Sequence, residues 1–241
     1  MGAHAIPQKY EEGPDKFVNI IIDRMLPHIA KNDLARFNDV FCEKGVFSIE
    51  QSREILIAGK RLGLIPKLHA DEIVSLGGGE LAAEVGCISA EHLMAVSDQG
   101  IKDLAEAQVV GILLPGTSFN LQKGTAAPAR KMIDKGVPIA IATDYNPGSC
   151  PSENLQFMMS LGSLLLKMTP NEVITAVTIN AAAGLGLEKE KGSITEGKIA
   201  DISIFDVPNL EYMIYHFGIN HTHMVIKDGK VIYKGGGYYV E

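Results

Sequence analysis

The stretch Pro138-Ile-Ala-Ile-Ala-Thr-Asp-Tyr-Asn-Pro-Gly-Ser149 joins an apolar run to a polar turn. The run from Ile139 to Ala142 predicts a short buried strand, and Asp144 follows at its carboxyl end. The residues after Asp144 are turn formers, so we expect the chain to leave the sheet there as a loop. Parallel α/β proteins place their chemistry at such strand ends, although a carboxylate there can also cap a helix or pair with a base. Position alone leaves both interpretations of Asp144 open.

Short buried strands alternate with helical patterns along most of the chain. Strands are expected near residues 3, 40, 68, 88, 111 and 141. The segments Ser48-Ile-Glu-Gln51 and Thr169-Pro-Asn-Glu172 have capping-box spacing and predict two helix starts. The alternation predicts an α/β protein with a parallel sheet and helices outside it. A closed (β/α)8 barrel needs eight strands and about 250 residues, so about six βα units predict an incomplete (β/α)8 TIM-type barrel.

The pattern changes after Gly186. Two apolar segments, 223–226 and 230–233, flank Asp228-Gly229, which predicts a tight hairpin. We therefore expect residues 1–186 to form the partial TIM-barrel domain and residues 187–241 to form a small C-terminal β segment of a β-sandwich. A segment of about fifty residues is too small to fold without something to pack on.

Composition excludes several classes of protein. The chain has 241 residues and a formal net charge of −7, which argues against a nucleic-acid or membrane partner. Its three cysteines, Cys42, Cys87 and Cys150, lie far apart without a CxxC pair and predict reduced thiols. Cys42 and Cys87 are expected in the core. The sequence shows no membrane-spanning run and no signal-peptide pattern, so we expect a cytoplasmic protein.

Imidazole and carboxylate side chains recur at the predicted strand ends. Because the carboxyl ends of barrel strands form one face, such side chains converge there. A lone histidine at a strand end is more often a satisfied polar residue, but recurrence on consecutive strands favours a shared site. Histidine with carboxylate suits one divalent metal ion that activates water, and favours Zn or Fe(II) over Mg or Ca. The residues are His4, Glu43, His69, Glu72, His92 and Asp144.

A second histidine pair has metal-like spacing. His221-Thr-His223 would place both imidazoles on one face of a strand. The pair precedes the hairpin in the C-terminal β segment, away from the barrel ends, so we do not expect it to bind metal.

Five motifs at the strand ends together resemble a known family. They are Gly2-Ala-His-Ala-Ile-Pro7, Val40-Phe-Cys-Glu-Lys-Gly45, His69-Ala-Asp-Glu72, Ser89-Ala-Glu-His92 and Thr143-Asp-Tyr-Asn-Pro-Gly-Ser149. Their combination is similar to the imidazolonepropionase family of metal-dependent amidohydrolases, which acts in histidine degradation. The resemblance covers nearly the whole chain, and residues 192–201 resemble the return of amidohydrolase chains into their β-sandwich domain.

The resemblance implies a role for each motif residue. His69 would be a metal ligand, and Asp144 would be both a ligand and the proton shuttle. Among the other catalytic residues, His92 would polarise the substrate carbonyl and Glu72 would hold the ring nitrogens. The implied reaction is hydrolysis of the ring amide of 4-imidazolone-5-propanoate to N-formimidoyl-L-glutamate, with one Zn or Fe ion. The implied substrate contacts are His4, Glu72, Asn146, Gly148 and Ser149.

The chain also departs from this family. Family members are longer and begin with β-sandwich strands and two barrel strands, of which the first supplies two further histidine ligands. An Arg and a Tyr expected to hold the substrate carboxylate belong to the same part. We therefore expect this chain to be the C-terminal portion of such a protein. Because only His69 and Asp144 remain of the expected ligands, the chain alone is expected to bind metal weakly and turn over slowly or not at all.

Two alternatives remain open. The chain can be a non-catalytic fragment that needs its N-terminal half, because an open sheet leaves unpaired edges and apolar surface. It can also be an amidohydrolase acting on another cyclic amide or an amidine, such as a purine or pyrimidine deaminase. The motifs around His4 and Asp144 favour the imidazolone substrate. A homodimer is expected.

Overall fold

The computed structural model describes residues 2–7, 13–122, 124–235 and 237–238. It divides into two compact units. The first unit is Met1–Leu113 with Ala127–Ile139, and the second is Leu114–Ala126 with Ala140–Glu241. These units are compact groups of contacting residues and are not the predicted domains. The predicted domain boundary between residues 186 and 187 therefore stays a prediction.

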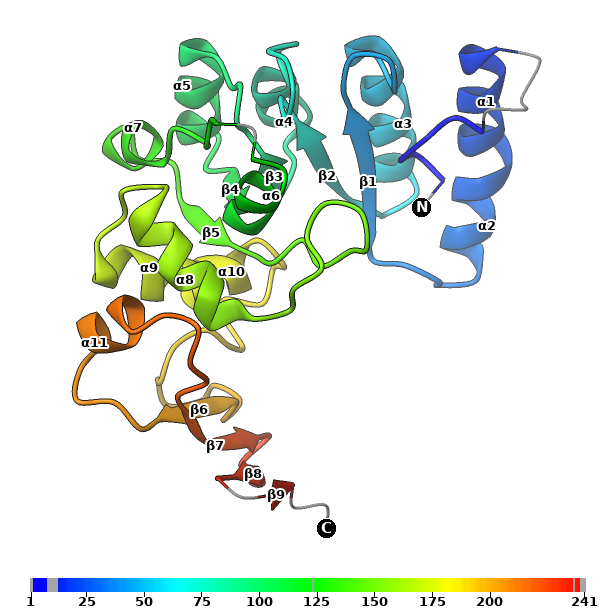
Figure 1. Cartoon of the computed structure of the whole chain (residues 1–241). Helices are drawn as coiled ribbons and strands as arrows, with labels where there is room; N and C mark the ends of the chain where they lie inside the picture. The colour runs from blue at the N-terminus through cyan, green and yellow to red at the C-terminus, as the bar shows by residue number, and fades with distance from the viewer. Residues whose placement is uncertain (1, 8–12, 123, 236, 239–241) are drawn as a thin grey trace. The chain divides into compact units, whose positions relative to one another are not determined.

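A five-stranded sheet carries the α/β architecture, with the strands in the order β1-β2-β3-β4-β5. The pairs β1–β2, β2–β3 and β3–β4 are all parallel. In the first unit, helices connect successive strands and lie along one side of them (Figure 1). This arrangement confirms the predicted class of a partial barrel with helices outside. The strands are β1 (Phe37–Cys42), β2 (Ile65–Ala70), β3 (Ser89–His92), β4 (Val110–Leu113) and β5 (Ile139–Ile141), and the connecting helices are α3 (Ile49–Arg61), α4 (Gly78–Val85), α5 (Asp98–Glu106) and α7 (Ala129–Asp134).

The strand predicted near residue 3 is absent from the described residues, and this prediction was wrong. Residues 2–4 form a turn and a bend. One strand-like hydrogen bond remains, in which the Phe41 N–H donates to the Ala3 carbonyl at 3.0 Å. Pro7 has no N–H to give a ladder, and residues 2–4 turn instead of extending. The described parallel sheet therefore has five strands and not six.

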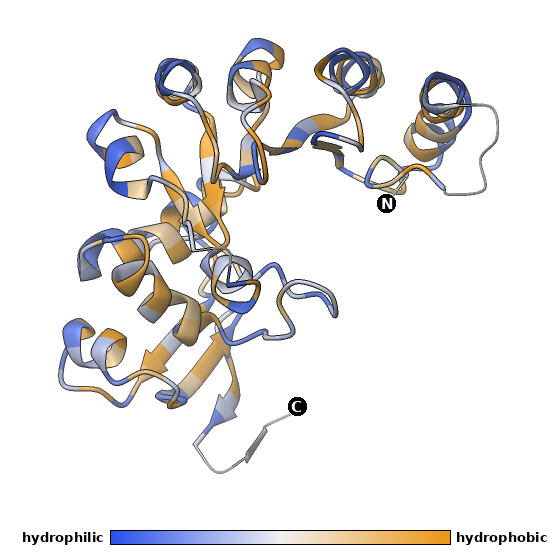
Figure 2. Ribbon diagram, turned by 45° about the horizontal axis from the view of Figure 1, so that its top comes forward, coloured by the Kyte–Doolittle hydropathy of each residue, from blue (hydrophilic) through white to orange (hydrophobic). Residues whose placement is uncertain are grey.

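The first two strands alternate between a buried and a half-buried face. In both, every second residue is buried and the intervening residues are half-buried. The buried residues pack under the helices, and Figure 2 shows the hydrophobic colour concentrated along the strands. The other face, called here the polar face, carries Phe37, Asp39 and Phe41 of β1 with Lys67 and His69 of β2.

The start of α4 explains the glycine-rich segment at residues 77–79. A Cβ atom on Gly78 would lie 2.8 Å from the Ala70 Cβ, and one on Gly79 would lie 2.9 Å from a Val96 methyl. Glycine therefore lets the helix approach β2 closely. The buried carboxylate of Asp71 accepts the Gly78 N–H at 3.1 Å and the Gly79 N–H at 2.9 Å. Asp71 thus caps this helix from the end of the neighbouring strand.

The N-terminal helical pattern forms a helix with a π-helical centre. Its apolar face, predicted from the sequence, contributes buried Phe17, Ile21 and Leu26. Pro27 has no N–H and therefore cannot donate the hydrogen bond that a regular α-helix makes to the carbonyl four residues earlier. This missing bond accounts for the π-helical turn before it. The segments are α1 (Pro14–Ile20), the π-helix η1 (Ile21–Met25) and α2 (Leu26–Lys31).

The second unit combines short helices with an antiparallel sheet, ordered β6-β7-β8-β9. The predicted hairpin is confirmed, with left-handed backbone at Asp228 (φ 50°) and Gly229 (φ 76°). Both predicted capping boxes, at Ser48 and Thr169, are also confirmed. The elements are α6 (Pro115–Asn120), α8 (Leu155–Leu164), α9 (Pro170–Val177), α10 (Ile179–Ala183), α11 (Leu210–Tyr215), β6 (Ile202–Phe205), β7 (Thr222–Lys227), β8 (Lys230–Lys234) and β9 (Gly237–Tyr238).

All three cysteines are free and buried, as expected for Cys42 and Cys87. Burial raises the pKa of the Cys42 thiol to about 11 and that of Cys87 to about 12. No helix in the described ranges has the length and apolar character needed to cross a membrane.

Candidate functional site

Three imidazoles of the first unit lie side by side, and we call His4, His69 and His92 the histidine row. The ring centroids of His4 and His69 are 5.5 Å apart and the rings are nearly perpendicular. Those of His69 and His92 are 5.3 Å apart. Phe41 stacks on His4 at 5.1 Å. The first unit therefore brings together three predicted site residues from the N-terminal segment, β2 and β3.

His69 and His92 occupy different positions on their strands. His69 is the fifth residue of β2, one residue before its end, and lies on the polar face. His92 is the last residue of β3 and is only 5% exposed. The backbone is left-handed at His92 (φ 71°) and again at Leu93 (φ 56°), so the chain turns sharply there. His92 thus marks the strand end as predicted.

Glu72 joins the histidine row from the loop after β2. One of its carboxylate oxygens, Oε2, lies 3.7 Å from His92 Nε2, and both side chains are mostly buried. This distance suits an ion pair and exceeds a normal hydrogen bond. The preceding Asp71 holds the loop by accepting the Leu76 N–H at 2.8 Å in addition to the two N–H groups of α4. Four predicted residues, His4, His69, Glu72 and His92, therefore converge at these strand ends.

Glu43 has a structural position beside this group. Its side chain is buried, and its two oxygens accept the Lys44 N–H and the Ile73 N–H, each at 2.8 Å. The carboxylate thereby ties the loop after β1 to the loop after β2. Both oxygens are used inside the protein, so Glu43 acts as a brace for the loop next to Glu72.

Two carboxylates on the polar face were missed in the sequence. Both Asp39 oxygens lie 3.0 Å from His69 Nδ1. One potential ligand atom from each of Asp39, His69 and Glu91 lies within 4.8 Å of the others, and this is the one such group of three among the described residues. Strand alternation could have placed Asp39 on the same face as Phe41, but its contact with His69 depends on the register of β1 and β2.

Glu91 already has a cationic partner. The Lys67 ammonium lies 2.8 Å from Glu91 Oε1 and also donates to Ser89. The Ser89 hydroxyl donates to the same Glu91 oxygen at 2.6 Å. A divalent cation bound by Glu91 would meet this ammonium at close range, which is electrostatically unfavourable. Glu91 is therefore better described as the counter-ion of Lys67 than as a metal ligand.

Asp144 of the second unit lies three residues beyond β5, with left-handed backbone (φ 54°). Its Oδ2 accepts a hydrogen bond at 2.6 Å from the hydroxyl of Thr117, a fully buried residue of α6. The Ser149 hydroxyl donates to the same oxygen at 3.3 Å. The cap of the next helix, α8, is Asn154 and not Asp144. The capping alternative for Asp144 was therefore wrong.

Asn146 organises the segment 143–150, called here the Asp144 loop. Its amide nitrogen donates to the Asp144 carbonyl and to the Ser149 hydroxyl, each at 2.7 Å. Its amide oxygen accepts the N–H groups of Gly148 at 2.8 Å and Ser149 at 2.7 Å. These four bonds use the two donors and two lone pairs of the amide. The loop gathers the predicted residues Asp144, Asn146, Gly148 and Ser149, and the substrate contacts of the last three stay predictions.

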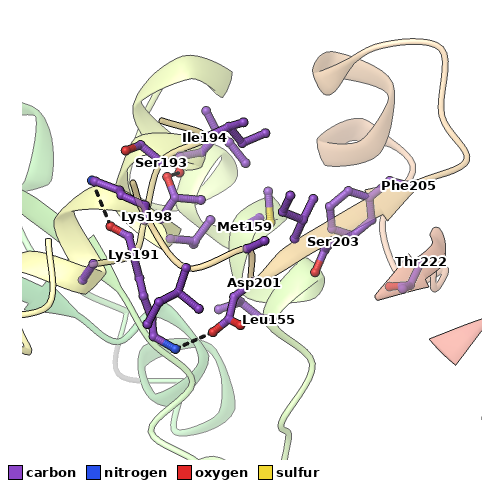
Figure 3. A pocket seen from close by; sticks show the side chains of 18 of the residues that line it. Leu155, Met159, Lys191, Ser193, Ile194, Lys198, Asp201, Ser203, Phe205 and Thr222 are labelled. Atoms are coloured by element: carbon purple, nitrogen blue, oxygen red, sulfur yellow. Dashed lines mark hydrogen bonds and ion pairs between the residues drawn. The ribbon is translucent and has the colours of Figure 1, made fainter. Parts of the chain in front are cut away.

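A separate cavity of about 1090 Å³ lies in the second unit, between α8, β6 and residues 191–201 (Figure 3). Along its wall, Lys191 reaches Asp201 at 2.5 Å, and Lys198 donates to the Lys191 carbonyl. Hydrogen bonds from Lys191 and then Lys227 hold the pKa of Asp201 well below its usual range. None of the predicted site residues lines this cavity, so the cavity is not evidence for the predicted catalytic site.

The second histidine pair has local structural partners. His221 precedes β7, is mostly buried, and its Nε2 lies 3.1 Å from the His216 carbonyl. The His221 ring also packs against the rings of Tyr212 and His216. Through these contacts, His221 packs against α11 and the loop that follows it.

Solved structures of similar fold include an adenosine deaminase from Xanthomonas campestris with bound zinc. The superposition covers 95% of this chain and 59% of that chain, with a TM-score of 0.73 and 18% sequence identity. A triazine hydrolase variant gives a TM-score of 0.74 over 91% of this chain and 57% of its own, at 16% identity. At these identities the likeness concerns the fold alone, and it agrees with a partial barrel.

Curated relatives are much closer in sequence. An imidazolonepropionase from Alkaliphilus oremlandii is 61% identical over 236 residues, which are 98% of this chain and 56% of that protein. One from Fusobacterium nucleatum is 56% identical over 97% of this chain and 56% of its own length. The chain thus spans about half the length of the curated relatives it matches. The family model described as the amidohydrolase family matches residues 66–232. The chain therefore belongs to the amidohydrolase family.

Proposed function

We propose that this chain carries part of a metal-dependent hydrolase that opens the ring amide of 4-imidazolone-5-propanoate to N-formimidoyl-L-glutamate. The observation that carries the proposal is the 61% identity to the Alkaliphilus oremlandii imidazolonepropionase over 98% of the chain. The geometry adds support within each unit, because the histidine row meets Glu72 in the first and Asp144 meets Ser149 in the second.

The chemistry of the predicted ligands, an imidazole and a carboxylate, suits one divalent metal ion. Imidazole and carboxylate ligands favour Zn or Fe. A metal-binding histidine commonly donates its second ring N–H to a carboxylate, and His69 lies at hydrogen-bond distance from Asp39. We assign His69 and Asp144 as the ligands that this chain supplies. The metal would polarise the ring carbonyl and make water a better nucleophile at neutral pH.

The side chains of this chain move the protons of the reaction. Asp144 takes a proton from the water that attacks the ring carbonyl carbon and returns it to the ring nitrogen as the C–N bond breaks. The Thr117 hydroxyl orients the Asp144 carboxylate through its 2.6 Å hydrogen bond. His92 donates a hydrogen bond to the carbonyl oxygen as negative charge develops there.

The remaining residues hold the substrate. Glu72 accepts hydrogen bonds from the ring N–H groups, and its position beside His92 brings the two functions together. The further substrate contacts are His4, Asn146, Gly148 and Ser149. A homodimer and a cytoplasmic location remain predictions.

A second function is favoured by the edge of the antiparallel sheet. Strand β6 pairs with β7 alone in the described sheet order, and Ile194, which lines the same cavity as Ile202 and Phe205 of β6, is 89% exposed. An unpaired edge beside apolar side chains is a surface that another strand can cover. This favours the alternative of a non-catalytic fragment that needs another chain.

A substrate panel separates these functions. The chain is assayed alone and after mixing with the separately produced N-terminal part of the Alkaliphilus oremlandii relative. We expect N-formimidoyl-L-glutamate from 4-imidazolone-5-propanoate in the mixture, and little or none from the chain alone. Stable association without product would favour the non-catalytic fragment. Deamination of a purine or pyrimidine without imidazolone hydrolysis would favour the other amidohydrolase. Activity of the chain alone that mixing does not increase would contradict the need for a second part.

A further inference from the structure

Asp39 contacts His69 from the neighbouring strand. In the register of β1 and β2, Asp39 lies opposite Lys67, and Phe41 lies opposite His69. The Asp39 side chain therefore reaches His69 diagonally across the polar face. Both Asp39 oxygens lie 3.0 Å from His69 Nδ1, which is a normal hydrogen-bond distance. This position gives the carboxylate control over one ring nitrogen.

The contact determines which nitrogen of His69 carries the proton. An ionised carboxylate can only accept hydrogen bonds, and a neutral imidazole has one N–H and one lone pair. In a neutral ring, a carboxylate at Nδ1 favours the proton on Nδ1 and the lone pair on Nε2. We infer that Asp39 is the positioning residue of His69, and that it fixes Nε2 as the ring nitrogen that binds the metal.

The surrounding side chains complete this control. The His69 ring is flanked by His4 at 5.5 Å, by His92 at 5.3 Å and by Phe41 at 6.0 Å between centroids. These rings limit how far the imidazole can tilt, whereas Asp39 decides which nitrogen faces away from β1. The neighbouring rings do not distinguish Nδ1 from Nε2, whereas the Asp39 carboxylate lies at hydrogen-bond distance from Nδ1.

The alternative role for Asp39 is that of a ligand, together with His69 and Glu91. The Lys67 ammonium 2.8 Å from Glu91 argues against it, because a dication would be repelled there. Without Glu91, the group of three loses its only deeply buried carboxylate. A positioning role uses the same short Asp39–His69 distance and leaves the Lys67–Glu91 pair intact.

The test compares Asp39→Asn, Asp39→Ala, Glu91→Gln and His69→Ala with the exposed control Asp134→Asn. Ring nitrogen NMR on the metal-free chain reports the His69 tautomer, and His69→Ala assigns its signals. The wild-type chain should show the Nδ1–H form, and Asp39→Ala should shift it toward Nε2–H. Asp39→Asn should largely keep the Nδ1–H form, because an amide oxygen also accepts. The Asp39 side chain is 35% exposed, so its truncation leaves no buried void.

Cobalt(II) affinity, measured by competition with a coloured chelator, is the second readout. It is measured on the mixture with the N-terminal part of the Alkaliphilus oremlandii relative, because the chain alone is expected to bind metal weakly. Asp39→Ala should weaken binding by about 10- to 100-fold, and Asp39→Asn by less. The Glu91→Gln and Asp134→Asn variants should bind nearly as the wild type does. Circular dichroism on each variant checks that the fold is retained.

The inference rests on the proposed ligand role of His69, and the outcomes separate the two. An unchanged tautomer or affinity in Asp39→Ala overturns the inference and leaves the ligand role standing. A Glu91→Gln loss as large as that of His69→Ala places the metal on the group of three and also overturns it. Cobalt affinity that is undetectable in the wild type, or unchanged in His69→Ala, overturns the ligand role and the inference with it.

Discussion

The histidine row and the Asp144 loop hold their side chains by different means. Two rings of the row, His69 and His92, come from strands, and Asp39 reaches His69 from a neighbouring strand. In the Asp144 loop, the carboxylate is held by residues of the same loop and by one hydroxyl of α6. The sheet register fixes the first arrangement and local hydrogen bonds fix the second. We therefore expect the two regions to respond differently to mutation and to local unfolding.

Asp71→Ala should have the largest effect on stability and tests the frame of the histidine row. It removes the acceptor of three backbone N–H groups, those of Leu76, Gly78 and Gly79. Leaving buried donors unsatisfied costs about 1–3 kcal/mol each, so we expect a total loss of about 3 kcal/mol or more. Urea unfolding measures it. The exposed Asp134→Ala is the control, with a change of about 0.5 kcal/mol or less. A loss below about 1 kcal/mol in Asp71→Ala would contradict its capping role.

Thr117→Val should have a smaller effect, confined to the Asp144 loop. The substitution keeps the shape of a fully buried residue and removes its hydrogen bond to Asp144. We expect a loss of about 1 kcal/mol, with faster hydrogen exchange in the Asp144 loop and unchanged exchange in β1 and β2. The control is Thr175→Val, an exposed residue whose hydroxyl donates to the Asn171 carbonyl one helical turn back. Equal exchange rates in the two variants would show that Thr117 does not restrain the loop.

The labelling rates of the three cysteine thiols allow the two regions to be compared without any mutation. Cys42 and Cys87 belong to the first unit, where burial raises their pKa values to about 11 and about 12. Cys150, at the end of the Asp144 loop, is equally buried and burial also raises its pKa. We expect a thiol reagent to label Cys150 first, through local opening, and the other two only through global unfolding. Labelling rates in increasing urea distinguish these routes, and three equal rates would remove the contrast.

The pH dependence of stability should follow from the same buried thiols. An ordinary thiol pKa is 9.0. Above that pH, ionisation of Cys42 stabilises the unfolded chain, whereas the thiol in the folded chain stays protonated up to about pH 11. The contribution of Cys42 is therefore fully present below about pH 9 and declines as the pH rises to about 11. Cys42→Ala should show a flatter decline in urea midpoint over this range than Cys150→Ala. An identical decline in both would contradict the stronger shift at Cys42.

Local patterns in the sequence predicted much of the fold. The capping boxes at Ser48 and Thr169 and the hairpin at Asp228-Gly229 each depend on residues a few positions apart, and all three are present. The convergence of His69, Glu72 and His92 followed from the rule that parallel strands end at one edge. His4 lies beside His69 although its segment forms no strand. The short helices α6 and α11 were missed, since each is too brief to show a helical period.

The missed site residues have a different cause. Asp39 and Glu91 meet His69 only through the register of three strands, and a slip of one residue would reverse their faces. Asp71 stood beside Glu72 in a recognised motif, but its capping role requires α4 to fold back against β2. The strand near residue 3 was expected from its motif alone, although residues 2–4 turn and Pro7 has no N–H for a ladder.

The most direct test of the proposed function is the rate of N-formimidoyl-L-glutamate formation by Asp144→Asn, in the mixture with the N-terminal part of the relative. A positioned acid–base group contributes about 10²- to 10⁴-fold, so the account predicts a fall of at least about 100-fold. The control Asp134→Asn should keep the wild-type rate. A wild-type rate in Asp144→Asn would contradict the assignment of Asp144 as the proton shuttle.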